Sequence, residues 1–215
     1  MKSLAIGSSL LCAAVISLSM STAASASNLV INGGFEDTNL RSGTWRHYGV
    51  GQINGWTPTE GSRIEIRNNK VGTAYEGNNF TEVDSHAYDK NAEEVGLFQD
   101  IVTEIGQKYR LSFAYSPREQ NKVNGDNLLS VSFGDLYQEL DAGNNGDGWQ
   151  LFNQTIKATS DVTQLKFLSL GKRDTLGANI DDVHLEAVPE PFSVLGLFAV
   201  GAVGATSAIR KRFTA

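Results

Sequence analysis

Apolar and polar residues alternate with a period of two along much of the chain, which predicts β-strands rather than helices. The clearest segments are residues 64–66, 109–115, 129–133 and 165–167. Successive side chains of a strand point to opposite faces, so one face of each segment is expected in a core and the other in solvent. Between residues 27 and 186 the sequence has no long stretch with the apolar spacing of an amphipathic helix.

Short clusters rich in Gly and Asn separate these segments, for example residues 32–34, 54–55 and 143–148. Such clusters favour tight turns. Many short strands at this spacing predict an all-β fold, an antiparallel β-sandwich, formed by one domain over residues 27–186. A domain of roughly 160 residues buries about two-thirds of its extended surface, which is enough to fold without disulfides.

The first 26 residues have the pattern of a secretory signal peptide. Lys2 provides a positive start, residues 4–20 are mostly apolar, and residues 24–26 read Ala-Ser-Ala. This small-x-small pattern is one that signal peptidase cleaves, so we expect an N-terminal signal helix that is removed before Ser27. Cys12 is the only cysteine of the chain, and the exported domain is therefore expected to lack disulfides.

Residues 187–215 combine three features in a fixed order. The motif Val188, Pro189, Glu190 and Pro191 precedes an apolar run over 192–209, and a basic cluster follows at 210–212. A helix over this apolar run would be roughly 27 Å long, enough to cross the core of a bilayer, with the basic tail on the cytoplasmic side. The three features resemble the PEP-CTERM sorting signal of exported bacterial proteins. This resemblance implies a single transmembrane helix, an exosortase-type sorting enzyme as partner, and delivery to the cell surface or extracellular matrix.

Charge argues against nucleic acid as a partner. The 215 residues carry a formal net charge of −6, and their Lys and Arg residues do not form a basic stripe. Removal of both ends takes away four basic residues and Glu190, which changes the net charge from −6 to −9. Such a surface repels anionic polymers and attracts divalent cations.

The central segment carries a second resemblance. Its motifs are Asn28–Glu36 (NLVINGGFE), Gly55-Trp56, Glu82–Asp84 (EVD), Phe98–Ile101 (FQDI), Gly106–Phe113 and Ile180–Leu185 (IDDVHL). In this order they are similar to the galactose-binding-like jelly-roll domains, which include many carbohydrate-binding modules. The resemblance covers nearly all of residues 28–186, and it implies a jelly-roll sandwich with carbohydrate or exopolysaccharide as its ligand.

Glu36 and Asp181 are the first candidate metal ligands. Both stand at the ends of expected apolar strands, where a carboxylate must be paired, hydrogen-bonded or bound to a metal. In the resembling jelly rolls the corresponding residues help to hold a structural Ca²⁺, and Asp182 is a third candidate. The alternative is that Glu36 and Asp181 accept hydrogen bonds from backbone amides or pair with an arginine.

Aromatic side chains are the usual platforms for sugars, and Trp45 and Tyr48 lie in a polar segment beside Arg46 and His47. We take Trp45 and Tyr48 as candidate carbohydrate-binding residues; the alternative is that Trp45 folds back over the core. The other two tryptophans, Trp56 and Trp149, are expected in the core.

Arg118 follows an expected strand and completes the candidate carbohydrate-binding set. Glu82 and Asp84 are two residues apart, so they should share the face of a strand opposite Val83. The sequence predicts a solvated face for both.

No enzyme motif stands out. The sequence contains neither Gly-x-Ser-x-Gly nor His-Glu-x-x-His, and its three histidines lie in different segments. We therefore expect an exported, non-enzymatic β-sandwich that binds carbohydrate in the cell envelope or matrix. The alternatives are a structural matrix or adhesion protein without a specific small ligand and, with less support, a glycosidase.

Overall fold

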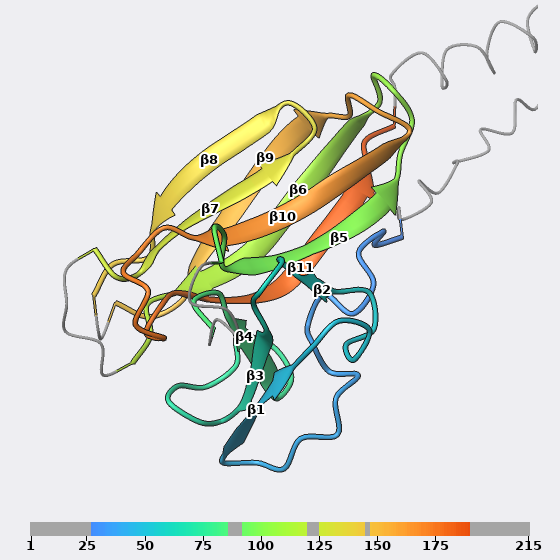
Figure 1. Cartoon of the computed structure of the whole chain (residues 1–215). Coiled ribbons are helices and arrows are strands. Elements are labelled where there is room, and N and C mark those ends of the chain that lie inside the picture. The colour runs from blue at the N-terminus through green and yellow to red at the C-terminus, as the bar shows by residue number, and fades with distance from the viewer. Residues whose placement is uncertain (1–26, 86–91, 120–124, 145–146, 190–215) are drawn as a thin grey trace, which may run out of the picture.

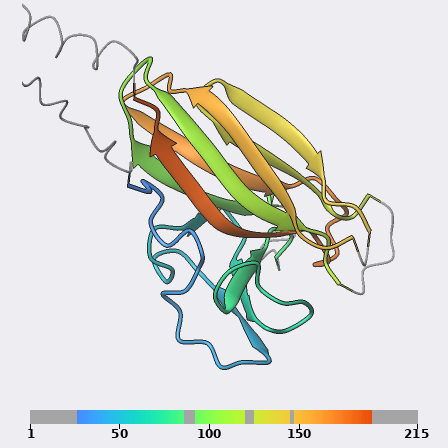
Figure 2. The same cartoon turned by 180° about the vertical axis from the view of Figure 1, so that it is seen from behind.

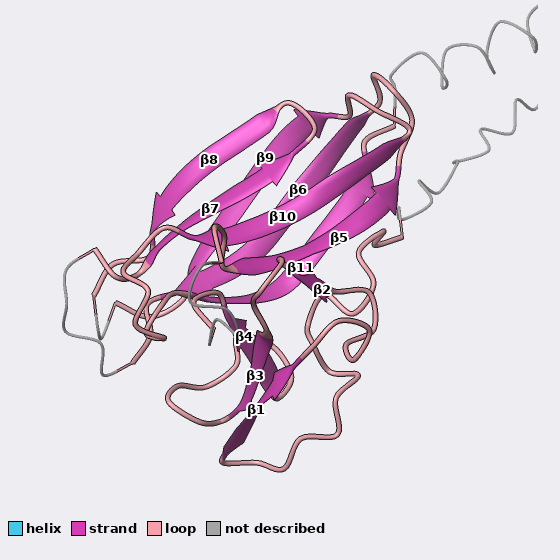
Figure 3. Ribbon diagram, viewed as in Figure 1, coloured by secondary structure: helices cyan, strands magenta, loops and turns pink. Residues whose placement is uncertain are grey.

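A computed structural model of the chain describes residues 27–85, 92–119, 125–144 and 147–189. The expected signal peptide, the apolar run, the basic tail, Glu190 and Pro191 lie outside these ranges. Within them every regular element is a strand (Figure 3). No segment in the described part of the chain forms a helix with the length and hydropathy of a membrane span.

The strands follow the chain as β1 (Thr44–Tyr48), β2 (Thr57–Pro58), β3 (Ile64–Asn68), β4 (Asn79–Glu82), β5 (Gly96–Val102), β6 (Lys108–Ser116), β7 (Leu128–Phe133), β8 (Leu136–Asp141), β9 (Gln150–Lys157), β10 (Val162–Ser169) and β11 (Asn179–Ala187). Sheet A has the order β1-β3-β4-β11-β6-β9, and sheet B the order β2-β5-β10-β7-β8. All neighbouring strands are antiparallel. Sheet B faces the viewer in Figure 1, and β11, β6 and β9 of sheet A do so in Figure 2. The predicted all-β antiparallel sandwich is therefore confirmed.

The core lies between the two sheets and follows the predicted alternation. In β7, Leu129, Val131 and Phe133 are buried inward, and β6 contributes Phe113 to the same layer. The rings of Phe113 and Phe167 meet across the sandwich with centroids 5.0 Å apart. Burial of aromatic rings from both sheets supplies the hydrophobic stabilisation that this disulfide-free domain requires.

The opening segment lies along the last strand without forming a strand itself. A turn was predicted at residues 32–34, and the chain does turn there, with positive φ angles of 54° at Asn32 and 60° at Phe35. The amide of Leu29 donates to the carbonyl of Leu185 at 2.8 Å. A Cβ at Gly33 would lie 2.0 Å from the carbonyl oxygen of Val183. Glycine is therefore required for this close approach.

Candidate functional site

The candidate site lies on the outer face of sheet A, where the strand register aligns polar side chains. His47 on β1 is opposite Glu65 on β3, and Glu65 is opposite Glu82 on β4. Glu82 is in turn opposite Asn179 on β11. Residues directly opposite in antiparallel strands share a face, so these side chains form one row across the sheet.

Two arginines bind the glutamates of this row. Nε of Arg67 donates to Oε1 of Glu65 at 2.7 Å, and its Nη2 pairs with Oε2 of Glu82. Nε of Arg118 lies 3.2 Å from Oε1 of Glu82. We call Glu65, Arg67, Glu82 and Arg118 the Glu–Arg network. Like charges directly opposite on neighbouring strands repel, and the arginines offset that repulsion.

The Glu–Arg network is largely buried, contrary to the solvated face predicted for Glu82. Arg67 is 2% exposed and Glu82 is 1% exposed. Burial lowers the pKa of both Arg67 and Arg118, and the negative charge of Glu65 opposes the shift. Both guanidinium groups remain cations, so each buried charge of the network has a partner of opposite sign.

Asp84 is also buried, and it holds the loop between β10 and β11. Its Oδ2 accepts hydrogen bonds from the amides of residues 174, 175 and 176 at 3.0 to 3.3 Å. Burial raises the pKa of Asp84 to about 6, and the three amide hydrogen bonds work in the opposite direction. The prediction that Asp84 is solvated was therefore wrong.

A glycine lets the same loop approach β4. The amide of Gly177 donates to Oε1 of Glu82 at 2.6 Å. A Cβ at Gly177 would lie 2.4 Å from Cβ of Asp84, a distance that other residues cannot reach without displacing the loop. The loop brings Thr175 to the edge of the Glu–Arg network.

A first pocket of about 180 Å³ opens beside the Glu–Arg network. It is lined by Trp45, His47, Glu65, Arg67, Val71, Arg118 and Thr175. The side chain of Trp45 is 48% exposed, and its ring stands edge-on to that of His47 with centroids 4.9 Å apart. Nη1 of Arg67 is buried and has no hydrogen-bond partner among the described residues. The pocket thus combines an exposed indole with a lining that is mostly polar or charged.

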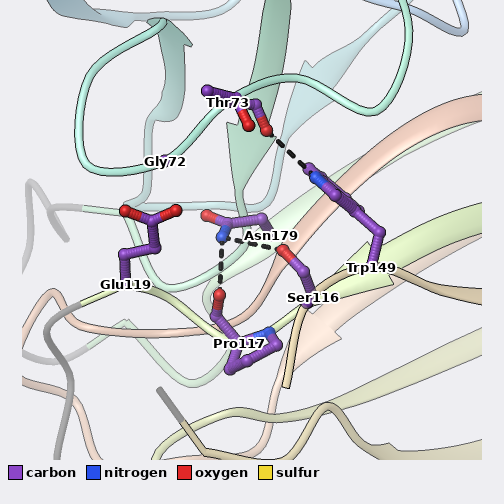
Figure 4. A pocket seen from close by; sticks show the side chains of 8 residues that line it. Gly72, Thr73, Ser116, Pro117, Glu119, Trp149 and Asn179 are labelled. Carbon is purple, nitrogen blue, oxygen red and sulfur yellow. Dashed lines mark hydrogen bonds between the residues drawn. The ribbon is translucent and has the colours of Figure 1, made fainter. Parts of the chain in front are cut away.

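A second pocket of about 140 Å³ lies on the same face (Figure 4). Its indole is that of Trp149, whose Nε1 donates to the carbonyl of Thr73 at 3.0 Å. The side-chain nitrogen Nδ2 of Asn179 donates to Oγ of Ser116 at 3.2 Å and to the carbonyl of Pro117 at 3.1 Å. Oδ1 of Asn179 is buried without a partner in the described structure. An aromatic ring beside polar side chains therefore recurs here.

The two pockets are adjacent, because consecutive residues of the same two loops line them. Val71 lines the first pocket and Gly72 the second; Arg118 lines the first and Glu119 the second. The pockets therefore offer neighbouring positions to one elongated ligand.

Trp149 was expected in the core, and that prediction was wrong. It is only half-buried, and its ring packs edge-on against Phe80, with centroids 5.9 Å apart. Strand alternation, extended back by one residue from β9, would have predicted this position. Phe152 points into the core, so Trp149, three residues earlier, lies on the outer face.

The structure brings Trp45 and Arg118 together and leaves Tyr48 apart from them. Tyr48 lies opposite the core residue Ile64, is half-buried and packs against the core. Trp45 and Tyr48 are three residues apart on β1, and this spacing directs their side chains to opposite faces of the strand.

Glu36 and Asp181 lie near each other and accept hydrogen bonds from backbone amides. Oε1 of Glu36 accepts from Asn78 at 2.6 Å and from Asn79 at 2.7 Å. Oδ2 of Asp181 accepts from the amides of residues 75 and 76, and its Oδ1 from the amide of Asp182 at 2.7 Å. Burial raises the pKa of Asp181 to about 7, with these amides opposing the shift.

Asp182 extends this acidic corner toward solvent. Its Oδ1 lies 2.7 Å from Nε2 of His184. Ligand atoms of Glu76, Asp182 and His184 all lie within 4.8 Å of one another. A hydrogen bond with Asp182 and the charge of that residue raise the pKa of Glu76. Together with Glu36 and Asp181, Glu76 and Asp182 bring the number of carboxylates in this acidic corner to four.

No family model matches the chain, and no curated protein matches it. Solved structures do. CBM4 is 17% identical, with 74% of this chain and 99% of that chain covered and a TM-score of 0.42. TmCBM61 in complex with β-1,4-galactotriose is 15% identical, with coverages of 76% and 100% and a TM-score of 0.44. A family 16 carbohydrate-binding module is 14% identical, with coverages of 74% and 99% and a TM-score of 0.47. These are similarities, and no family is assigned to the chain.

Proposed function

We propose that this chain is an exported, non-enzymatic binding protein that holds a carbohydrate chain on the outer face of sheet A. The observation that carries the proposal is the pair of adjacent pockets, each lined by an indole and by polar or charged side chains. Sugars present apolar ring faces and hydroxyl groups, which match these two kinds of surface. The resemblance of the central segment to galactose-binding-like jelly rolls supports the same ligand class.

The charge of the site favours a neutral polysaccharide. The two arginines of the Glu–Arg network are balanced by its two glutamates, and Glu119 adds a further acidic group at the second pocket. A uronic acid polymer would bring carboxylates to a surface that has no excess positive charge. Neutral hydroxyl groups both donate and accept, and therefore suit the network better.

The test is affinity electrophoresis of the purified domain in gels containing one soluble polysaccharide each: β-1,4-galactan, β-1,4-xylan, β-1,4-mannan, dextran or polygalacturonate. We expect retardation by at least one neutral polymer and none by polygalacturonate. Trp45→Ala and Trp149→Ala should each weaken binding by about tenfold or more in titration calorimetry, because each removes an aromatic contact surface.

Leu151→Ala is the matched control, because Leu151 is an exposed apolar residue of sheet A that lines neither pocket. It should bind like the wild type. Equal binding by all three variants would rule out the site. Release of reducing sugar from a bound polymer would instead support the glycosidase alternative.

Export and sorting form part of the proposal and rest on the sequence motifs. Fractionation of cells that produce the full chain is expected to find the processed protein at the surface or in the matrix. Replacement of Pro189, Glu190 and Pro191 by alanine should retain the chain in the membrane fraction. An unchanged distribution would contradict recognition of the motif by a sorting enzyme.

We further propose that Glu36 and Asp181 hold a structural Ca²⁺. Two amides already engage Oε1 of Glu36, whereas Oδ1 of Asp181 accepts a single hydrogen bond and keeps a lone pair. Hard cations take such oxygen ligands, and the four carboxylates of the corner would gain from a positive charge. EGTA is expected to lower the Tm, and added Ca²⁺ to restore it. A Tm that ignores both would overturn this assignment.

A structural matrix protein is the second candidate, and one observation favours it. Val102 and Val162 are directly opposite each other on β5 and β10, and both are largely exposed together with Ile105. Such an apolar surface suits protein contacts. Self-association in light scattering that Val102→Ser abolishes, combined with no retardation by any polysaccharide, would favour this candidate over the first.

A further inference from the structure

The outer face of sheet B, the sheet that faces the viewer in Figure 1, carries a trough of about 520 Å³ that is lined by residues of β7, β8 and β10. The lining residues that could contact a ligand include Glu94, Ser130, Ser132, Tyr137, Lys166 and Leu168. Its size is within the range of ligand-binding clefts, about 300 to 1,000 Å³. We call it the serine trough.

Small side chains on a central strand make this hollow. On β7, Ser132 lies between Tyr137 on β8 and Lys166 on β10. Ser130 lies between Glu139 on β8 and Leu168 on β10. Serine is a poor strand former, and longer side chains usually cover such a face. Two short hydroxyl side chains between long ones leave a floor that is both low and polar.

Tyr137 provides an aromatic surface that is already oriented. It is 62% exposed, and its hydroxyl donates to Oε1 of Glu139 at 3.0 Å. Glu139 is two residues further along β8, so this bond holds the ring along its own strand. A ring held in this way loses little conformational entropy when a ligand stacks on it.

The rim of the trough is polar and fixed as well. Nζ of Lys166 lies 3.0 and 3.2 Å from the two carboxylate oxygens of Glu94. The guanidinium of Arg173 donates to the carbonyls of Ala92 and Glu93. Leu168 adds an apolar wall. Donors and acceptors around an aromatic ring again form a surface suited to a sugar.

We propose that the serine trough is a second carbohydrate site, so that the domain binds two polysaccharide segments, one on each outer face. This inference rests on the proposed function of sheet A and extends it. The trough lies on sheet B and the proposed site on sheet A, although the loop between β10 and β11 lines both, with Gly171 and Arg173 at the trough and Thr175 at the first pocket. With one site on each sheet, the domain holds two chain segments and cross-links the polymer.

The experiment mixes the domain with a soluble polysaccharide that retards it in affinity gels. Sedimentation then measures bridging, and titration calorimetry measures binding. The wild type is expected to sediment with the polymer as a network and to show two binding sites. Tyr137→Ala should abolish bridging and halve the number of sites, while binding through Trp45 persists.

Tyr137→Phe is the matched control, because it keeps the ring and removes only the hydroxyl group with its hydrogen bonds. It should still bridge, with binding to the trough weakened by no more than about threefold. Tyr137 is exposed, so neither variant should change the Tm.

The outcomes separate the two proposals. If Trp45→Ala abolishes all binding and Tyr137→Ala bridges like the wild type, the trough is not a site, and the proposed function stands. If Tyr137→Ala alone abolishes binding, the site on sheet A falls, and with it the bridging of two chains. A wild-type domain that binds none of the polymers overturns both.

Discussion

The two outer faces of the sandwich differ in where they keep their charges. On sheet A, four charged side chains of the Glu–Arg network lie on the sheet and are mostly buried. On sheet B, serines form the floor, and the ion pair of Lys166 and Glu94 stands at the rim with both side chains partly in solvent. Buried charges depend on their partners, whereas exposed pairs contribute little.

This difference has a consequence for the proposed sites. The pockets of sheet A are built from groups that also hold β1, β3, β4 and the loop over residues 172–178 together, so substitutions there should affect binding and stability jointly. In the serine trough, Tyr137 and Lys166 stand largely or partly in solvent, so binding and stability should separate at these two residues.

The largest effect is expected from Arg67→Met, which leaves Glu65 and Glu82 opposite each other without their shared cation. Breaking a buried ion pair in this way costs about 3 to 5 kcal/mol of unfolding free energy. Lys166→Met is the matched change on sheet B, where an exposed pair contributes about 1 kcal/mol at most. Urea denaturation compares the two. Equal losses would show that burial of the Glu–Arg network has no energetic importance.

The second effect concerns pH and Asp84. Its folded-state pKa of about 6 lies above the ordinary value of 3.8, so as pH rises the unfolded chain ionises first. Stability from this group is therefore full below about pH 4 and is lost as pH rises through 6, a change of about 3 kcal/mol. In Asp84→Asn, the side-chain oxygen can still accept the three amide hydrogen bonds. We therefore measure the free energy of unfolding against pH for the wild type and for Asp84→Asn, and expect the difference between them to show this fall. Parallel curves for the two proteins would contradict the raised pKa of Asp84.

The smallest effect is expected from Gly177→Ala. The new Cβ would collide with Asp84, and overpacking of this kind costs about 1 to 3 kcal/mol. Because the displaced loop carries Thr175, binding at the first pocket should weaken too. Gly49→Ala is the control, because a Cβ there would meet nothing closer than 3.6 Å. Thermal unfolding measures the change in stability, and calorimetric titration measures the change in binding. A Gly177→Ala variant as stable as the wild type would contradict the close approach of this loop to Asp84.

Several features of the site could be predicted from the sequence. Trp45 and Arg118 were candidates because an aromatic and a cation stood in polar segments, and both line the first pocket. Strict application of strand alternation would also have separated Tyr48 from Trp45 and placed Trp149 outside the core. These are local properties, and the period of two is sufficient to derive them.

The Glu–Arg network could not be predicted in this way. Glu65 and Glu82 each looked like a polar residue on the solvent side of a strand. Alternation places Arg67 on the same face as Glu65, but nothing in the sequence shows that Arg67 and Arg118 both reach Glu82. Likewise, Ser130 and Ser132 become the floor of a trough only because β8 and β10 place longer side chains on both sides of them.

Alternation along the chain therefore determined the strands, their buried faces and the all-β class, since each strand's face pattern is set by residues two apart. Only the tertiary structure decided which carboxylate meets which guanidinium, and where hollows remain between side chains. Those outcomes depend on the register between strands that are distant in sequence, and register is set by the packing of the whole sandwich.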